Sequence, residues 1–253
     1  MNYKSIAIKA AKEAGKILKK EFSGVLDVKA KEKHDIVSNA DYRSEKKIIE
    51  IIEKAFPLHA IVAEESGKSG KKSDYVWYID PLDGTANFIT GNPYFSISIA
   101  LAHKNKIILG VVYNPILDEL YLAEKGKGSR LNGKRMLISN KSNIKDAILA
   151  SAYSSNESDI KKGLRTVEKL ALNSRKVVIN FSPALDLCNI ANGRLDGLID
   201  NGTTPEDHAA GSLIVTEAGG KITNYSSKVW NVDKIGIIAS NKKIYNSIIK
   251  IFF

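Results

Sequence analysis

Apolar residues recur every three or four positions near the start of the chain, which is the spacing of one face of a helix. Residues 3–22 show this pattern. A second stretch of the same kind runs to about Ala55 from a helix cap at Ser38 or Asn39, and Pro57 closes it. The pattern therefore predicts two helices early in the chain.

Strand patterns dominate the middle of the chain. Apolar and polar residues alternate there with a period of two, and turn residues such as Asn132-Gly133 separate the runs. Short strands are expected at residues 25–31, 61–63 and 75–79, and longer ones at 95–102, 106–113, 117–123 and 130–138. Pro81 is expected to end the strand at 75–79, because proline cannot donate to a sheet ladder. The longer runs predict an antiparallel meander.

Strands and helices alternate in the second half, which is typical of α/β proteins. The expected strands are residues 147–153, 176–181, 194–200 and 235–239, and the expected helices are residues 159–172, 184–191, 207–218 and 241–252. We therefore predict a layered α/β (α+β) fold in a single domain, residues 1–253, with subdomains of about 1–140 and 141–253.

The composition is that of an ordinary globular protein, with 43% hydrophobic and 26% charged residues in 253. One cysteine, Cys188, excludes an internal disulfide framework and suits a reducing compartment. No run of 18 apolar residues and no apolar signal core are present, so a membrane span and secretion are not expected. We expect a cytoplasmic protein without a membrane partner.

The formal net charge of +10 is compatible with nucleic-acid binding or with steering of phosphorylated substrates. The basic residues are spread along the chain, however, and no block of five or six like charges occurs. A lysine-rich solvated surface explains the charge more simply, so a nucleic-acid partner is not expected.

Residues 66–74 are rich in Gly, Ser and Lys and directly follow Glu64-Glu65. This composition predicts a mobile loop. Because the loop follows an acidic pair, it is a candidate lid over a metal site, and a plain surface loop is an equally good interpretation.

Asp80 and Asp83 lie three residues apart at the end of a predicted buried strand. Carboxylates in such a place are unfavourable without a cation or a donor. Gly84 allows the backbone to come close to a ligand. Asp83 or Thr85 is expected to cap a short helix that runs through Asn87. The first N–H groups of that helix would form a phosphate site. Both aspartates are also common turn formers, so the motif alone leaves a simple turn open.

Four carboxylates come from four places in the chain, and three of them lie just past predicted strand ends or at a predicted helix start: Glu64, Asp80, Asp83 and Asp207. Strand ends of an α/β sheet converge on one crevice, so these side chains are expected to meet. An all-carboxylate set favours Mg²⁺ or Mn²⁺ over zinc. The four histidines show no metal-ligand spacing: His34, His59, His103 and His208.

The stretch D-P-L-D-G-T-A-N-F-I-T-G, which begins at Asp80, resembles the first signature of the inositol monophosphatase family of Mg²⁺-dependent, lithium-sensitive sugar phosphatases. Glu64-Glu65-Ser66 is similar to the E-E-S element of that family. Residues 207–211 (D-H-A-A-G) and 216–220 (T-E-A-G-G) resemble its second signature. Order and spacing agree from about residue 3 to residue 252, which is far more specific than a lone glycine-rich loop.

The resemblance implies alternating α-β-α-β-α layers, a homodimer and two or three Mg²⁺ ions per subunit. Glu64, Asp80 and the Leu82 carbonyl would hold one ion, which activates a water. Asp80, Asp83 and Asp207 would hold a second ion, which stabilises the leaving alkoxide.

The resemblance also implies that Asp41 and Thr85 orient and deprotonate the water, with Glu64 contributing through the first ion. From its position alone, Asp41 would instead be a residue that complements a helix dipole. The N–H groups of Gly84 and Thr85 would bind the phosphate, next to Asp83.

Substrate contacts are implied at Ser182, near the ring, and at Asp200, which would accept bonds from polyol hydroxyls. The chain departs from the family pattern around these positions. Phe181 replaces a usual glycine and Pro183 replaces a small residue, whereas Glu206 and His208 replace an aromatic and an apolar residue, respectively. These changes leave the carboxylate set intact and bear on the choice of polyol.

We expect hydrolysis of inositol 1-phosphate first, and fructose 1,6-bisphosphate 1-phosphatase or dual activity as the alternative. The second phosphate of the bisphosphate needs cations, for which Arg165, Arg175 and Lys176 are candidates. A bacterial member of the family also binds transcription machinery and RNA, so a regulatory protein is the alternative of another class.

Overall fold

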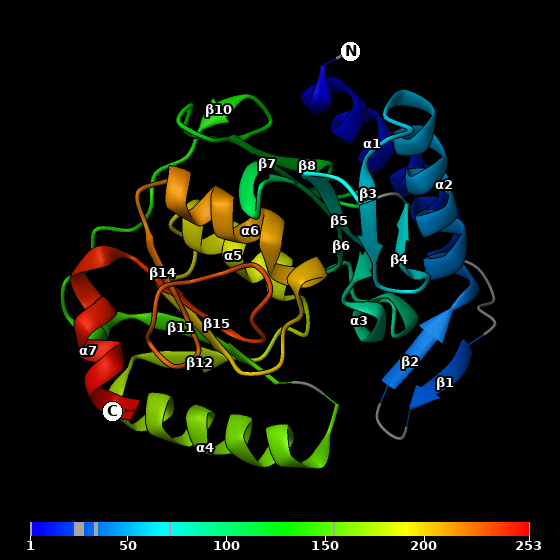
Figure 1. The fold of residues 1–253 in the computed structure, drawn as a ribbon. Helices are drawn as coiled ribbons and strands as arrows, with labels where there is room; N and C mark the ends of the chain where they lie inside the picture. The colour runs from blue at the N-terminus through cyan, green and yellow to red at the C-terminus, as the bar shows by residue number, and fades with distance from the viewer. Residues whose placement is uncertain (1, 23–27, 33–34, 71, 154, 253) are drawn as a thin grey trace.

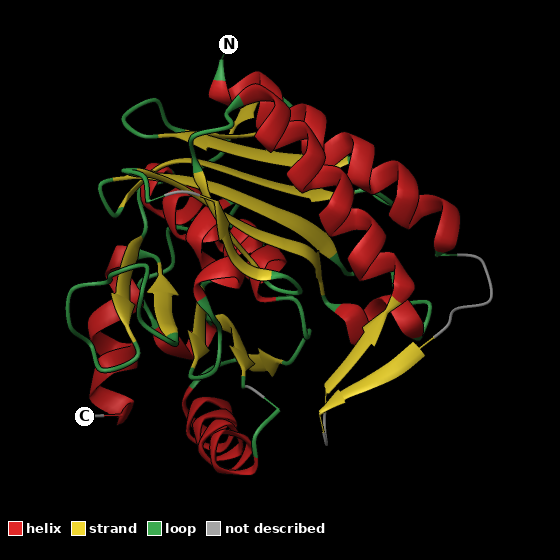
Figure 2. Ribbon diagram, turned by 45° about the vertical axis from the view of Figure 1, so that its right-hand side comes forward, coloured by secondary structure: helices red, strands yellow, loops and turns green. Residues whose placement is uncertain are grey.

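The computed structural model describes residues 2–22, 28–32, 35–70, 72–153 and 155–252. Its helices and strands form five layers in the order helix, sheet, helix, sheet, helix (Figure 1; Figure 2). Three hydrophobic clusters fill the spaces between the layers. The layered α/β fold predicted from the sequence is therefore confirmed. Among the described residues, no helix is long and apolar enough to cross a bilayer.

Two helices, α1 (Tyr3–Glu21) and α2 (Asn39–Ala55), form one outer layer. The buried face of α1 is rich in alanine, which lets the helix lie close to its neighbours. Ser38 caps α2: its Oγ accepts from the Ala40 N–H (3.2 Å), and its own N–H donates to Asp41 (2.9 Å). Both predicted helices are confirmed, with Ser38 as the cap.

An eight-stranded sheet lies under these helices, in the order β10-β9-β8-β7-β6-β5-β3-β4. Its strands are β3 (Ala60–Ala63), β4 (Gly67–Gly70), β5 (Tyr75–Asp83), β6 (Ser96–His103), β7 (Lys106–Asn114), β8 (Glu119–Glu124), β9 (Ser129–Leu131) and β10 (Lys134–Arg135). Only β3 and β5 pair in parallel among these described strands. The predicted meander is confirmed, with the run at 130–138 divided by the Asn132-Gly133 turn into β9 and β10.

Two stretches that the sequence did not predict as strands form strands. Gly67–Gly70 pairs antiparallel with β3 at the sheet edge, so the mobile lid predicted at residues 66–74 is wrong for this strand; Lys71 lies outside the described residues. Asp35–Ser38 forms β2, which pairs with β1 (Val28–Glu32), whereas residues 25–27 of that predicted strand lie outside the described residues. Backbone hydrogen bonds at the edge of a sheet form without apolar side chains, so the polar composition of β4 and β2 did not indicate a strand.

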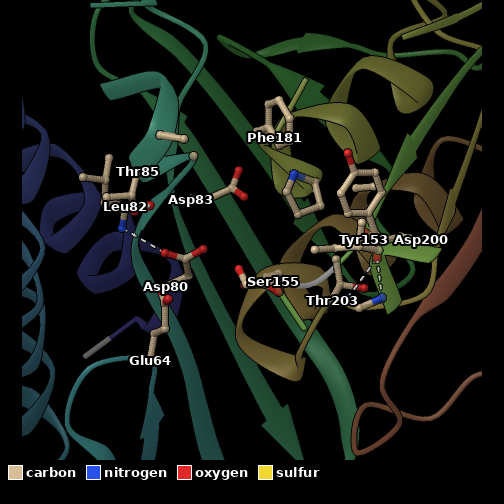
Figure 3. A pocket seen from close by; sticks show the side chains of 17 residues that line it. Glu64, Asp80, Leu82, Asp83, Thr85, Tyr153, Ser155, Phe181, Asp200 and Thr203 are labelled. Carbon is tan, nitrogen blue, oxygen red and sulfur yellow. Dashed lines mark hydrogen bonds between the residues drawn. The ribbon is translucent and has the colours of Figure 1, made fainter. Parts of the chain in front are cut away.

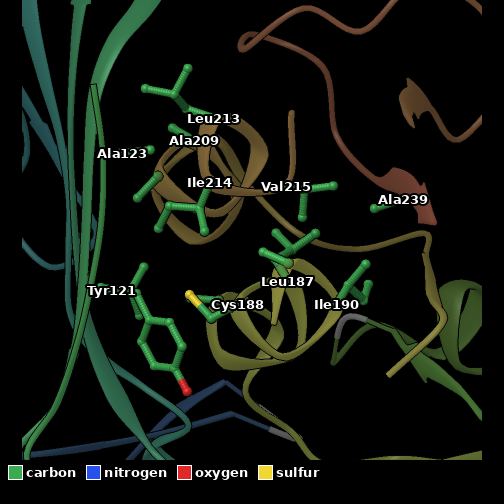
Figure 4. Packing of buried hydrophobic residues seen from close by; sticks show 14 of the residues in the cluster. Tyr121, Ala123, Leu187, Cys188, Ile190, Ala209, Leu213, Ile214, Val215 and Ala239 are labelled. Carbon is green, nitrogen blue, oxygen red and sulfur yellow. The ribbon is translucent and has the colours of Figure 1, made fainter. Parts of the chain in front are cut away.

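The central layer consists of α5 (Pro183–Ala191) and α6 (Pro205–Glu217), which are buried between the two sheets (Figure 4). Leu187 and Cys188 of α5 pack there with Ile214 of α6. A Cβ atom at Gly211 would lie 2.5 Å from Leu187 Cδ1, so glycine is what allows the two helices to approach so closely. Both helices occur where the sequence predicts them.

A five-stranded sheet follows, in the order β12-β11-β13-β15-β14, and two outer helices cover it. Its strands are β11 (Ile148–Ala152), β12 (Lys176–Val178), β13 (Gly197–Asp200), β14 (Lys221–Asn224) and β15 (Ile237–Ser240), and the helices are α4 (Glu157–Asn173) and α7 (Lys242–Phe252). Of these elements, β14 was not expected. A 3₁₀ turn at Ile144–Asp146 lies near the expected boundary between subdomains, and that division stays a prediction.

Candidate active site

Strand β5 contains a bulge that positions two carboxylates. Asp80 pairs with Ser98 and Asp83 pairs with Ser96, so two residues of β5 lie opposite one residue of β6. The prediction that Pro81 ends the strand is wrong, because the bulge takes proline out of the ladder and pairing resumes beyond it. The buried Ser44 hydroxyl donates to the Pro81 carbonyl (2.8 Å), which fixes the bulge against α2.

The short helix α3 (Thr85–Ile89) begins directly after this bulge. Its cap is Gly84, with φ +95° and no side-chain cap bond, so the prediction that Asp83 or Thr85 caps the helix is wrong. A Cβ atom at position 84 would lie 3.1 Å from the Tyr94 carbonyl oxygen and 3.2 Å from that of Phe181. Only glycine satisfies both the backbone angle and these contacts.

Asp41 and Thr85 are brought together from α2 and α3. The Thr85 hydroxyl lies 3.1 Å from Asp41 Oδ1 and 3.1 Å from the Leu82 carbonyl oxygen, and can donate to either. The Ser38 N–H (2.9 Å) and hydroxyl (2.7 Å) donate to Asp41 Oδ2. Burial raises the pKa of Asp41, and these donors oppose the rise. The carboxylate is therefore oriented and held ready to accept a proton.

A cavity of about 390 Å³ opens beside this pair, and the four predicted carboxylates line it: Glu64, Asp80, Asp83 and Asp207 (Figure 3). Burial raises the pKa of Asp80 well above its ordinary value, and the charges of the other three raise it further. Burial likewise raises the pKa of Asp83 to about 7 and that of Asp207 to about 8. The sequence-based expectation that these residues meet at one place agrees with this arrangement.

Neighbouring groups fix Asp83 and Asp207. The hydroxyls of Ser96 (3.0 Å) and Ser182 donate to Asp83 Oδ2. Asp207 is the third residue of α6, and its Oδ2 accepts from the Thr204 N–H (2.7 Å) in a capping box. These bonds engage Oδ2 of each carboxylate and fix its orientation toward the cavity.

The donor set fits a hard divalent cation, as carboxylate and carbonyl oxygens are the ligands that Mg²⁺ prefers. No lysine or arginine is among the described residues that line the cavity, so the protein itself does not neutralise these charges there. Among the described residues, no three His, Cys, Asp or Glu side chains form a ready-made metal site by geometry alone. The fit therefore rests on the chemistry of the four carboxylates and on the burial of Asp80 and Asp83.

Asp200 lies across the cavity from β5, at the end of β13 (Figure 3). Its Oδ1 accepts from the N–H groups of Gly202 (2.7 Å) and Thr203 (3.0 Å), and burial raises its pKa to about 6. Ser182, by contrast, is buried and is not among the described residues on the cavity wall; its hydroxyl holds Asp83. The predicted ring contact of Ser182 is not seen in this arrangement.

The cations expected to bind a second phosphate lie elsewhere. Arg175 pairs with Asp146 (2.8 Å), and Arg165 lines a different cavity, next to α7. Neither these arginines nor Lys176 is among the described residues around the carboxylates.

The sequence did not point to Tyr153, Ser155, Ile160 and Thr203, which also line the cavity. A signal existed in the topology: Ala152 pairs with Asp200 in the parallel ladder between β11 and β13. The residues that follow two neighbouring parallel strands share one edge of the sheet, so Tyr153 belongs beside Asp200.

The chain belongs to the inositol monophosphatase family, whose model matches residues 2–252. It is 39% identical to the Nus factor SuhB of Haemophilus influenzae, over 95% of this chain and 91% of that protein. Its fold is similar to an extragenic suppressor protein suhB from Bartonella henselae (TM-score 0.92, 34% identity, 98% of this chain and 96% of that one). It is also similar to an inositol monophosphatase (IMPase) from Thermotoga maritima (TM-score 0.90, 34% identity, 99% of this chain and 96% of that one).

Proposed function

We propose that this chain is a Mg²⁺-dependent phosphomonoesterase that hydrolyses inositol 1-phosphate to inositol and phosphate by direct attack of water. The observation that carries the proposal is one cavity in which the Asp41–Thr85 pair adjoins four carboxylates. Bound Mg²⁺, two or three ions per subunit, would supply an activated water and stabilise the charge that develops on the phosphate. Mn²⁺ suits the same oxygen ligands.

The carboxylates would hold these ions in two overlapping sets. Glu64, Asp80 and the Leu82 carbonyl would form one set, and Asp80, Asp83 and Asp207 would form the other. The raised pKa values of these aspartates support this assignment, because buried like charges are stable together only when a cation balances them.

The Asp41–Thr85 pair would orient the attacking water and take its proton. When the Thr85 hydroxyl donates to Asp41, its oxygen is left with a lone pair that can accept a hydrogen bond from water. The raised pKa of Asp41 makes it a stronger base than an exposed aspartate. The N–H groups of Gly84 and Thr85 would bind the phosphate, and Asp200 would accept bonds from the polyol hydroxyls.

The direct test is phosphate release from inositol 1-phosphate and fructose 1,6-bisphosphate in parallel, with Mg²⁺ and with EDTA. We expect turnover of the monophosphate that requires Mg²⁺ and stops with EDTA. Release that persists in EDTA, or no release from either compound, would contradict the proposal.

Hydrolysis of fructose 1,6-bisphosphate is the second candidate for the same site. It is less well supported, because the described cavity wall has no lysine or arginine for a distal phosphate. Comparable turnover of both substrates would show that a cation reaches the cavity in the complex, from this chain or from a partner subunit in the expected homodimer. Light scattering of the purified protein tests that dimer.

A regulatory role in transcription is a candidate of another class. The similarity to proteins named Nus factor SuhB and the net charge of +10 favour it. Binding to RNA that weakens steeply with salt would support this role. The expected result is weak binding without sequence preference, because the basic residues do not form a block.

A further inference from the structure

Phe181 has a backbone conformation that aromatic residues rarely adopt. Its φ is +54°, in the left-handed region. The other described non-glycine residues with positive φ are polar: Lys104, Asn105, Asp118, Asn132 and Ser227. A bulky residue there is strained, which requires neighbouring contacts that hold it in place.

Those contacts lie on both sides of Phe181. The Asn180 carbonyl accepts from Asn87 Nδ2 (2.6 Å), and Asn180 Nδ2 donates to the buried Asp186 (2.7 Å). On the other side, the Ser182 hydroxyl donates to Asp83. Both neighbours are thus tied to other elements, and the backbone between them must follow the left-handed path.

This path directs the Phe181 side chain into the cavity. The residue is 51% exposed, although burial would be favourable for an aromatic ring. Tyr153, Ile160 and Pro183 line the same cavity. Phe181 and Tyr153 lie on the side away from Glu64 and Asp80 (Figure 3). The cavity therefore has the metal-site carboxylates on one side, and aromatic and apolar side chains beside Asp200 on the other.

We propose that Phe181 is a specificity-determining residue that packs against the apolar face of the substrate's ring. This inference rests on the proposed function. With the phosphate bound beside the metal-site carboxylates, a cyclic polyol can direct hydroxyls to Asp200 and present its C–H face to Phe181. An open-chain polyol phosphate has no such face, so the enzyme should prefer cyclic substrates.

The test compares kcat/KM for inositol 1-phosphate with kcat/KM for glycerol 2-phosphate, in the wild type and in Phe181→Gly, Phe181→Ala and Phe181→Tyr. Loss of the aromatic ring should reduce the cyclic-over-open-chain preference about two- to tenfold in the Gly and Ala variants, the range expected for one aromatic contact. Phe181→Tyr should keep the preference. Lys104→Gly, at an exposed turn with φ +51°, is the matched control and should leave the preference unchanged.

Thermal unfolding gives an independent readout of the strain. Phe181→Gly should melt roughly 2–4 °C above Phe181→Ala, because both lack the ring and only glycine relieves the left-handed strain. An unchanged substrate preference in both variants would overturn the inference while leaving the proposed function intact. A wild-type enzyme that hydrolyses neither substrate would overturn the proposed function, and the inference with it.

Discussion

Carboxylates in this site are oriented by hydrogen bonds to groups of the fold. Asp41 uses Oδ2 to bind Ser38 and directs Oδ1 to Thr85. Asp207 uses Oδ2 to cap α6. The same side chain can therefore stabilise the fold and take part in the site. A substitution that keeps the shape of the side chain and removes its charge or hydroxyl can separate the two roles.

Thr85→Val should lower kcat about 100-fold or more, because it removes the hydroxyl that orients the water and keeps the side-chain shape. The Mg²⁺ concentration needed for half-maximal activity should change little. Thr85→Ser, which keeps the hydroxyl, should retain much of the activity. A Val variant with normal kcat and weakened Mg²⁺ dependence would contradict the role given to Thr85.

Asp207→Asn should abolish turnover and leave the fold intact. Asparagine can still accept from the Thr204 N–H through its Oδ1, so the cap of α6 is preserved while the charge needed for a cation is lost. Phosphate release and circular dichroism measure the two effects separately. Near-normal activity in a folded variant would argue against a metal ligand at this position.

At the level of elements, side-chain periodicity predicted most helices and strands. It failed where backbone hydrogen bonds to neighbouring strands determine the structure. The bulge at Pro81 and the edge strand Gly67–Gly70 depend on the ladder formed with neighbouring strands. Strand β14 directly follows Gly219-Gly220, and Ile222 is the only aliphatic residue among its four, so it contains no apolar run that would indicate a strand.

The candidate site also has a part that the sequence predicted and a part that depends on the backbone. The four carboxylates could be found from the sequence because charge at strand ends is chemically unusual. The roles of Ser182 and Phe181 could not, because they depend on which way the backbone turns between Asn180 and Pro183. That turn is set by hydrogen bonds to Asn87, Asp83 and Asp186, which lie on other elements.

Glu217 joins two elements at the far end of α6. Its carboxylate accepts from the N–H groups of Gly126 (2.7 Å) and Gly128 (2.8 Å), in the turn between β8 and β9. Glu217→Ala should lower the free energy of unfolding by about 1.5–3 kcal/mol, because hydrogen bonds to a charged acceptor are lost. Glu217→Gln should lose less, since one oxygen remains. Urea denaturation measures both, and kcat should be unchanged in each.

At the scale of the whole molecule, a protein with a net charge of +10 gathers acidic groups in one cavity that residues of both sheets line. The cavity lies between the bulge of β5 in one sheet and the end of β13 in the other, so the site needs both sheets and the helices between them (Figure 1; Figure 3). Because the pKa values of its carboxyl groups are raised, this region should make the stability of the metal-free protein depend on pH.

The direction of that dependence follows from the raised pKa values of Asp83 (about 7), Asp186 (about 7) and Asp207 (about 8). A carboxyl with a raised pKa binds its proton more tightly in the folded state than in the unfolded state. The free energy of unfolding therefore falls as pH rises through these values. His59 and His208, whose pKa values burial lowers, act in the opposite direction only below about pH 6.5.

We therefore expect the metal-free protein to melt at a higher temperature at pH 6.5 than at pH 8.5, as measured by calorimetry in EDTA. Mg²⁺ should raise the melting temperature more at pH 8.5, because it binds the ionised carboxylates of the folded state. Asp186→Asn is the control: Asp186 is not a proposed ligand, so this variant should reduce the pH dependence without weakening the response to Mg²⁺. A melting temperature that rises with pH in EDTA would mean that these carboxylates are balanced within the protein itself.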